Sequence, residues 1–384
     1  LIMTQHSGTG KSNQMFLRGF NLDHGTDFST KVDGMPVNLR THGHGQGYTD
    51  INFLIPELIR TISYVKGPYH AELGDFSSAG GAHIRTFDRL NQGQLSVGIG
   101  ENGFLRGLTA ADTALGQGQL LGAIEAQRYD GPWTDIDEDL DKVNALLRWS
   151  GEGVNSSYGV TAMFYDADWN SADQLPQRAV RNGLVDALGS IDPTLGGSTR
   201  RSSLSGMHAW EVGRHRNEIN AWIIDYDFEL WSNFTYLLDD PVNGDQFEQV
   251  DSRTIYGGDW SLRWLGAIGR GHLHHTLGAQ FRYDDIGKVG LYRTRERERL
   301  GLTRLDSVDE TSVGLYYEME WRISEKWRSV LGLRGDYYWF DVKSNLPENS
   351  GDESDGIVSP KGLSLIHISE PTRLVHSSRM PSSA

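Results

Sequence analysis

The stretch Thr311-Ser312-Val313-Gly314-Leu315-Tyr316-Tyr317-Glu318-Met319-Glu320-Trp321 decides the fold class. Its odd-numbered positions are mostly apolar, whereas its even-numbered positions include Ser312, Glu318 and Glu320. Successive side chains of a β-strand point to opposite faces of the sheet, so a period of two places the apolar groups on one face. The stretch therefore predicts a β-strand with one apolar and one polar face.

The same alternation recurs along the chain after residue 94 and predicts about eleven strands. We place them at 94–100, 105–111, 119–127, 141–149, 158–166, 203–212, 217–230, 253–265, 272–284, 309–321 and 327–341. From the second strand onward, short and long connections alternate, and tryptophans gather near the strand ends. Transmembrane β-barrels have short turns on one side, long loops on the other and aromatic girdles, whereas a soluble sandwich has no reason to sort its connections. The pattern predicts an antiparallel transmembrane β-barrel.

Residues 1–88 follow a different pattern, rich in glycine and in turn signals. Asp33-Gly34 stands between two short β-type runs, which is typical of a tight hairpin. Pro56 to Arg60 predicts one helical turn that leads into a strand from Thr61 to Val65. This part of the chain is therefore expected to be a small α/β unit.

The composition excludes several classes of protein. The 384 residues contain no cysteine, which excludes a disulfide scaffold, a thiolate metal site and a catalytic thiol. The net charge of −15 argues against binding to nucleic acid, which requires a basic surface. No run of apolar residues is long enough for a transmembrane helix.

Five short motifs in the first unit occur together in a recognisable order. They are Phe16-Leu17-Arg18-Gly19-Phe20, Val32-Asp33-Gly34-Met35-Pro36-Val37, Ile62-Ser63-Tyr64-Val65-Lys66-Gly67-Pro68, Ala71-Glu72-Leu73-Gly74 and Ala79-Gly80-Gly81-Ala82. In order and spacing they resemble the plug domain of TonB-dependent outer-membrane receptors, and the resemblance covers about residues 1–361. It implies a mainly β fold, with a small α/β plug domain at 1–88 and an incomplete antiparallel transmembrane β-barrel at 89–361. That barrel would hold about 11 of the family's 22 strands.

The resemblance also implies a function. Members of this family import a scarce nutrient across the outer membrane of Gram-negative bacteria, most often a ferric siderophore or similar metal chelate. The implied partners are the TonB–ExbB–ExbD energy-transducing complex, the small-molecule substrate and outer-membrane lipid. No cofactor and no enzymatic activity are implied.

Two departures from the family pattern lead us to expect a fragment. The TonB box and the first part of the plug are missing, as is about half of the barrel. The end of the chain also breaks the strand pattern: Leu365 to Arg373 resembles a translated sequencing adapter. We expect 362–384 to be a non-native tail; the alternative is a native short strand, Ser364 to Ser369, with a disordered tail.

One glycine-rich loop, His42-Gly43-His44-Gly45-Gln46-Gly47-Tyr48, carries the first candidate ligand-binding residues. Plug loops of the family commonly contact substrate, so the resemblance makes His42, His44, Gln46 and Tyr48 candidates, with His24 joining the same surface. Imidazole suits iron, copper, nickel and zinc, but no third ligand is identifiable, so a metal site stays unknown. The alternative is a plug loop packed against the barrel wall.

A second candidate is a run of alternating arginines, Arg293, Arg295 and Arg297, followed by Arg299. We expect them in a long loop, where an extended backbone would align the guanidinium groups along one edge. Arginine pairs well with carboxylate and phosphate, so an anionic chelate or a lipopolysaccharide phosphate is a possible partner. The alternative is pairing of these arginines with neighbouring glutamates.

Other functions are weaker. Gly8-Thr9-Gly10-Lys11-Ser12 lacks the first glycine of a phosphate-binding loop, and no helix pattern follows it. No set of residues suggests a catalytic centre. The main alternative is a soluble or secreted β-rich carbohydrate-binding module; an outer-membrane hydrolase would need a catalytic set outside this sequence.

Overall fold

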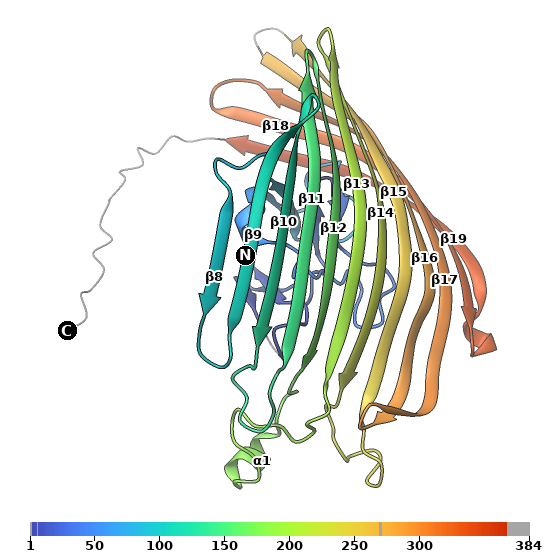
Figure 1. Cartoon of the computed structure of the whole chain (residues 1–384). Coiled ribbons are helices and arrows are strands. Elements are labelled where there is room, and N and C mark those ends of the chain that lie inside the picture. The colour runs from blue at the N-terminus through green and yellow to red at the C-terminus, as the bar shows by residue number, and fades with distance from the viewer. Residues whose placement is uncertain (1, 6, 269–270, 367–384) are drawn as a thin grey trace.

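A twelve-stranded antiparallel sheet curves around a small N-terminal domain (Figure 1). The computed structural model describes residues 2–5, 7–268 and 271–366. The strands of the large sheet are β8 (Gln94–Ile99), β9 (Leu105–Leu115), β10 (Gly118–Tyr129), β11 (Leu140–Gly153), β12 (Ser156–Asn170), β13 (Gly196–Val212), β14 (His215–Ser232), β15 (Phe247–Ile268), β16 (Gly271–Arg295), β17 (Glu298–Arg322), β18 (Trp327–Ser344) and β19 (Gly351–Ile366). Each pairs with its neighbour in sequence, so the sheet is a continuous meander.

The alternation of apolar and polar residues in the sequence corresponds to the outer and inner faces of this sheet. On β17, Val313 and Leu315 are exposed on the convex outer face, whereas Glu310 and Ser312 are buried on the inner face. The mainly β fold, with a small plug domain and an incomplete barrel, is thus confirmed. A β-sandwich or solenoid, which the carbohydrate-binding alternative required, is excluded.

Long connections gather at one end of the sheet and short turns at the other (Figure 1). We call the first the loop end; it carries 130–139, 171–195 with helix α1 (Gln177–Arg181), and 233–246. The other, which we call the turn end, carries 116–117, 154–155 and 213–214. This sorting is the one expected of a membrane barrel. None of the helices among the described residues is long and apolar enough to span a membrane.

Two details of the predicted strands are wrong. The stretch between β16 and β17 is not a long loop, because both strands continue to a tight turn at Glu296 and Arg297, where φ is 52° and 68°. A twelfth strand, β19, which is not among the eleven predicted, begins at Gly351. Both extensions are rich in charge on both faces, so they lack the polar–apolar contrast that reveals a strand, while main-chain pairing still forms.

The N-terminal domain contains two small sheets. One holds β1 (Ile2–Thr4), β2 (Gln14–Leu17) and β3 (Phe20–Asn21); the other holds β4 (Phe28–Val32), β5 (Met35–Pro36), β6 (Ile59–Lys66) and β7 (Gly80–Thr86), in the order β5-β4-β7-β6. Asp33 and Gly34 form the predicted hairpin turn, with φ of 46° and 86°. The predicted helical turn is the short η1 (Pro56–Leu58), which leads directly into β6.

The N-terminal domain, or plug, packs through a shared hydrophobic core against the inner face of the twelve-stranded sheet, which we call the wall. Val32, Met35 and Leu58 of the N-terminal domain cluster with Leu121 and Met163 of the wall. The remaining wall residues of this cluster also come largely from β9 to β14. We call this part of the contact the apolar side.

The predicted division at residue 362 stays a prediction. β19 continues through Ile366 and pairs there with Trp327 of β18. The rest of the predicted tail, 367–384, lies outside the described residues.

Candidate functional site

The glycine-rich loop is closed at its base by main-chain hydrogen bonds. The N–H of Leu39 donates to the carbonyl of Tyr48 (2.9 Å), and the N–H of Gly47 donates to the carbonyl of Leu39 (2.8 Å). The side-chain amide of Asn38 donates to the carbonyls of Gly25, Phe28 and Gly47 at 3.0–3.2 Å. The loop is therefore held in one conformation beside the wall.

His42 lies inside the contact between this loop and the wall. Its ring stacks on Tyr48 with centroids 4.3 Å apart, and Nε2 lies 3.3 Å from the hydroxyl of Tyr226. Burial lowers the pKa of His42 well below its usual value, and the nearby Arg253 lowers the pKa further. The main-chain N–H of His44 donates to Nδ1 of His42. The imidazole is thus neutral, with its proton on Nε2.

His44 and His24 extend the cluster toward the loop end. Nδ1 of His44 lies 2.8 Å from Oε1 of Gln249, whose amide donates to the carbonyl of Gly43 (2.7 Å). The ring of His24 packs beside His44 at 4.9 Å and beside Tyr48 at 5.7 Å. The sequence prediction that His24 joins the same surface as the glycine-rich loop is therefore matched by the placement of the rings.

Gln46 is the exposed member of the predicted set. Its Oε1 accepts a hydrogen bond from the N–H of Thr41 (2.9 Å), so its side chain also fastens the loop. Tyr48 is buried, and burial raises its pKa well above the usual value, so the phenol is protonated. Within the described residues, no three histidine or acidic side chains converge on a metal position. His42 itself is packed on the wall, as the alternative reading expected.

Buried ion pairs line the wall beneath the loop, and the sequence prediction missed them. Arg253 makes a bidentate pair with Asp251 (2.5 and 2.6 Å), and Arg282 makes one with Asp284 (2.6 and 2.7 Å). In each pair the residues are two positions apart, so both side chains point from the same face of one strand. These ion pairs could have been predicted from the sequence, because in each case an Asp and an Arg stand two positions apart on the polar face of a strand.

The guanidinium groups of these pairs also hold the plug by its main chain. Arg253 donates to the carbonyls of Arg40 and Thr41, and Arg282 donates to the carbonyl of Asn38 (2.9 Å). A guanidinium has five N–H donors, so it can satisfy a carboxylate and carbonyl groups at the same time. The wall thus contacts plug backbone while its own charges are already neutralised.

Arg40 is the plug's own contribution to this network. Its guanidinium lies 3.0 Å from Asp75 and 3.5 Å from Glu310, and it donates to the hydroxyl of Ser312 (2.8 Å). Burial disfavours the charged form of Arg40, but the two carboxylates outweigh it and raise its pKa. Arg40 is therefore charged inside the contact.

A second anchor lies on β17 and β18. Arg334 pairs with Asp336 (2.6 Å) and donates to the carbonyl of Ala71 (3.3 Å), and Glu318 accepts from the N–H of Ala71 (2.7 Å). Glu318 also bonds His70 (3.1 Å), and this hydrogen bond raises the pKa of His70. We call the contact made by β15 to β18 the polar side.

The four arginines near residue 297 do not align along one edge. Arg297 turns inward and donates to the carbonyls of Thr194 and Leu195 and to the side chain of Asn170 at 2.7–2.9 Å. Arg299 makes a bidentate pair with Glu248 (2.6 Å). The expectation of an extended loop is wrong, because these residues belong to β16, its turn and β17, and a tight turn separates them.

Arg293 and Arg295 of this group are exposed. Both lie near the end of β16, and Nε of Arg295 is 3.7 Å from Glu296. Pairing with glutamate, the alternative reading, thus occurs in part. Arg297, by contrast, ties the β16–β17 turn to the 171–195 loop.

A polar cavity separates the plug from the wall toward the turn end. Its volume is about 740 Å³, and charged side chains from both partners line it. They include Arg85 and Asp88 of the plug and Arg148, Arg216 and Asp259 of the wall. The plug therefore meets the wall with space for water below the buried ion pairs.

A curved sheet that encloses a mixed α/β plug, with long loops at one end, defines the class of plugged β-barrels. A family model described as the TonB-dependent Receptor Plug Domain matches residues 2–81, and one described as TonB dependent receptor-like, beta-barrel matches residues 132–374. The chain belongs to the family of TonB-dependent receptors. The family comprises receptors for transport rather than enzymes.

Solved structures show the same fold. The ferric citrate transporter FecA in the unliganded form has a TM-score of 0.76 and 13% identity, covering 96% of this chain and 56% of its own. The ferric-catecholate import receptor Fiu from E. coli K12 has a TM-score of 0.71 and 13% identity, covering 95% and 63%. The copper transporter OprC has a TM-score of 0.68 and 16% identity, covering 93% and 55%. The chain spans little more than half the length of these structures.

Proposed function

We propose that the protein is an outer-membrane receptor of a Gram-negative bacterium that imports a ferric siderophore or a similar metal chelate, energised by the TonB–ExbB–ExbD complex. The observation that carries the proposal is a plug seated in a barrel beneath long loops, where arginines of the polar side hold the plug by its main chain. Such a plug blocks passage at rest and has a defined contact that can be released. Structures with the same fold include a ferric citrate transporter and a ferric-catecholate import receptor.

The proposed ligand site combines the plug cluster with the strand ends above it. His24, His42, His44, Gln46 and Tyr48 form its floor, and Arg293 and Arg295 supply exposed cationic groups for an anionic chelate. Arg297 acts by fixing the turn that follows them. His42 and Tyr48 act by supporting His44 and Gln46, because their own rings are buried.

The proposed path opens along the polar side. When the plug withdraws there, Arg253 and Asp251 stay paired with each other, and Glu310, which loses Arg40, becomes accessible to water. Withdrawal on the apolar side would instead expose Leu121 and Met163 to water. This exposure costs about 25 cal/mol of free energy per Å² of apolar surface. The cavity near Arg148 and Arg216 then continues the path toward the turn end.

Uptake of radiolabelled iron tests the proposed function. Cells that carry the intact receptor should take up iron supplied as ferric citrate or as a ferric catecholate, and uptake should disappear when TonB is deleted. Uptake that does not depend on the receptor for any ferric chelate, or that persists without TonB, would contradict the proposal.

Substitutions separate the ligand site from the scaffold. His44→Ala with Gln46→Ala should weaken binding of the imported chelate about tenfold or more while the plug stays folded, because both side chains reach the loop end of the cluster. His208→Ala is the matched control, since His208 stacks on Trp210 on the barrel strand β13, away from the plug. Equal binding by the double variant and the control would remove the cluster from the site.

Disulfide locks test the path, and these 384 residues contain no cysteine that would compete with the introduced pair. A Cβ at position 332 would lie 2.8 Å from the Cβ of Ala71, on the polar side, and a Cβ at position 34 would lie 3.2 Å from that of Asn220 on β14. Both separations are shorter than the roughly 3.5–4.5 Å of a disulfide, so each pair can be bridged once the two backbones move slightly apart. Oxidised Ala71→Cys/Gly332→Cys should block uptake more than oxidised Gly34→Cys/Asn220→Cys, and reductant should restore it. The opposite order would contradict the path.

A further inference from the structure

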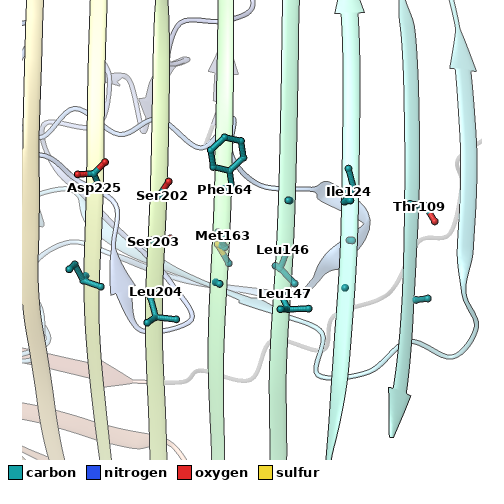
Figure 2. A pocket seen from close by; sticks show the side chains of 16 residues that line it. Thr109, Ile124, Leu146, Leu147, Met163, Phe164, Ser202, Ser203, Leu204 and Asp225 are labelled. Atoms are coloured by element: carbon teal, nitrogen blue, oxygen red, sulfur yellow. The ribbon is translucent and has the colours of Figure 1, made fainter. Parts of the chain in front are cut away.

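The motif Gly8-Thr9-Gly10-Lys11-Ser12 lies between the plug and the loop end, and we call it the strap. Gly10 rests so closely on the ring of Trp169 that a Cβ at this position would overlap the ring. Trp169 belongs to the inner face of β12, because it stands five residues after Phe164, which points to the outer face in Figure 2. The strap therefore runs along the inside of the wall, where the long loops begin.

Thr9 of the strap binds the 130–139 loop. Its main-chain N–H donates to Oε1 of Glu138 (2.6 Å), and its hydroxyl donates to the same oxygen. Glu138 is buried, and burial raises its pKa, whereas the two hydrogen bonds from Thr9 lower the pKa. The strap thus supplies part of the stabilisation that an ionised Glu138 needs inside this contact.

Lys11 of the strap binds the 171–195 loop. Its side chain is buried, and attraction to Asp173 of the loop and Asp23 of the plug opposes the cost of burying the ammonium group. Asp173 also accepts a hydrogen bond from the main-chain N–H of Asn233 (2.8 Å), the first residue of the 233–246 loop. Two loops are therefore held by the strap directly, and the third is held through Asp173.

The three loops are also tied to one another. The N–H of Thr134 donates to the carbonyl of Leu188 (2.9 Å), which joins the 130–139 loop to the 171–195 loop. The side-chain amides of Asn233 and Gln246 both donate to Oδ2 of Asp192 (2.9 Å each). Because these bonds connect the loops, we expect the loops to open and close together.

The strap also covers part of the proposed ligand site. The N–H of Ser12 donates to the hydroxyl of Tyr48 (3.2 Å), and the hydroxyl of Ser12 donates to the carbonyl of Thr49 (2.5 Å). The hydroxyl of Tyr48 is thus occupied by the strap. One short segment therefore connects the floor of the site to all three loops above it.

The attachment of the strap is of a kind that opens reversibly. Gly8 and Gly10 have no side chains to pack, so the strap is held mainly by hydrogen bonds and by attraction between buried charges. The cost of burying Glu138 and Lys11 offsets much of that attraction. Segments with few buried apolar contacts open locally at low free energy while the rest of the fold stays intact.

We propose that the strap is an autoinhibitory latch, which holds the three loops down on the plug and keeps the floor of the site closed until it opens. A chelate then reaches the floor only in molecules whose latch is open. The apparent affinity of such a receptor is reduced by the fraction of open molecules. The proposal rests on the proposed function for the site that is closed, but the attachment of the loops can be measured without any chelate.

Hydrogen exchange of the intact receptor without chelate tests the attachment. Thr9→Val/Lys11→Met keeps the shapes of both side chains but removes the hydroxyl and the ammonium group. Exchange of amides in 130–139 and 171–195 should become about tenfold faster or more, while exchange in β13 stays unchanged. Thr61→Val/Lys66→Met is the matched control, because both residues are exposed on β6 of the plug. Equal loop exchange in the two double variants would overturn the proposal.

A substitution in the loop provides a second test of the same contact. Asp173→Asn keeps an oxygen for the N–H of Asn233 but removes the charge that attracts Lys11. Loop exchange should become faster, and adding Lys11→Met should accelerate it little further, because both changes break one interaction. Fully additive effects would overturn the role of Lys11 in the latch.

The rate of chelate binding decides whether the strap closes the site or supports it. Ferric citrate and a ferric catecholate are mixed with the intact receptor in stopped-flow fluorescence. Thr9→Val/Lys11→Met should bind the imported chelate about threefold faster or more, because a larger fraction of molecules is open. Slower or weaker binding would overturn the latch, since the strap would then support the site. If neither chelate binds any form of the receptor, the import proposal fails, whereas loop exchange still decides the latch.

Discussion

The plug touches the barrel wall in two chemically different ways. On the apolar side, Leu58 and Met35 of the plug pack with Met163 of the wall in one hydrophobic core, and a bidentate ion pair joins Glu57 to Arg106 of β9 beside it. On the polar side, Arg253 and Arg282 donate to main-chain carbonyls of the plug. The first contact depends on the exclusion of water from apolar side chains. The second depends on the orientation of the hydrogen bonds and on the alignment of the plug backbone with the wall arginines.

The difference teaches which side can open reversibly. Hydrophobic packing gives a stabilisation that scales with area and is lost whenever water enters. The polar contact leaves behind wall ion pairs that remain complete without the plug. A pulling force therefore meets less resistance, and leaves a more hydrated surface, along β15 to β18. Four predictions follow this contrast from its largest to its smallest effect.

Removing one partner of a buried ion pair should have the largest effect. Arg253→Met leaves Asp251 without its bidentate partner and removes two hydrogen bonds to the plug, so the plug should lose about 3–5 kcal/mol of stability. Hydrogen exchange of plug amides in the intact receptor measures this loss. Arg253→Met/Asp251→Leu should recover part of it, and a double variant that is no better than the single would show that the unpaired carboxylate is not the cause.

Truncation on the apolar side should cost somewhat less. Leu58→Ala removes a fully buried side chain and should destabilise the plug by about 2–4 kcal/mol. Unlike the loss from Arg253→Met, this loss should not change with salt concentration, because no charge is involved. A clear salt dependence in hydrogen exchange of the Leu58→Ala receptor would erase the distinction between the two sides.

A buried acid on the plug should make its stability depend on pH. Burial raises the pKa of Asp50 to about 6, against 3.8 for a free side chain. Protonated Asp50 therefore stabilises the folded plug relative to the ionised form. This stabilisation is complete below pH 3.8, the pKa in the unfolded chain, and is lost as the pH rises to about 6, the pKa in the folded plug. Asp50→Asn should stabilise the plug by about 1–3 kcal/mol at pH 7 and have little effect near pH 4. The same gain at both pH values would rule out ionisation of Asp50 as its origin.

Truncation on the lipid-facing surface should have the smallest effect. Leu315 on β17 points outward and is 66% exposed. Since lipid tails are as apolar as leucine, Leu315→Ala should change stability by about 0.5 kcal/mol or less. Thermal unfolding of the intact receptor measures this. A loss as large as that of Leu58→Ala would mean that the outer face is covered by protein rather than lipid.

Sequence reasoning predicted those strands in which one face is apolar and the other is polar. The stretch from Thr311 to Trp321 is such a part, and its strand is confirmed. Near Arg295 and Asp352 both faces are polar, so the strands extend without a sequence signal and were expected as loops. Main-chain pairing needs no particular side chain, which is why the structure contains more strand than the pattern showed.

The candidate site was less accessible to sequence reasoning. The grouping of His24 with the glycine-rich loop followed from the plug resemblance, and the structure places their rings together. Packing of the loop on the wall was one of two alternatives, but the wall residues that cover His42 could not be predicted, because Tyr226 lies 184 positions away in the sequence. Contacts between distant segments leave no local pattern.

The arginines of the wall recognise carbonyl groups of the plug, and every residue type has a carbonyl. Exchanging one side chain for another at Thr41 or Ala71 therefore leaves these hydrogen bonds in place, whereas inserting or deleting one residue between positions 38 and 41 would move every carbonyl out of reach. Plug sequences in this lineage should accordingly diverge by substitution while keeping their length here. The wall arginines can therefore stay the same while the side chains of the plug change.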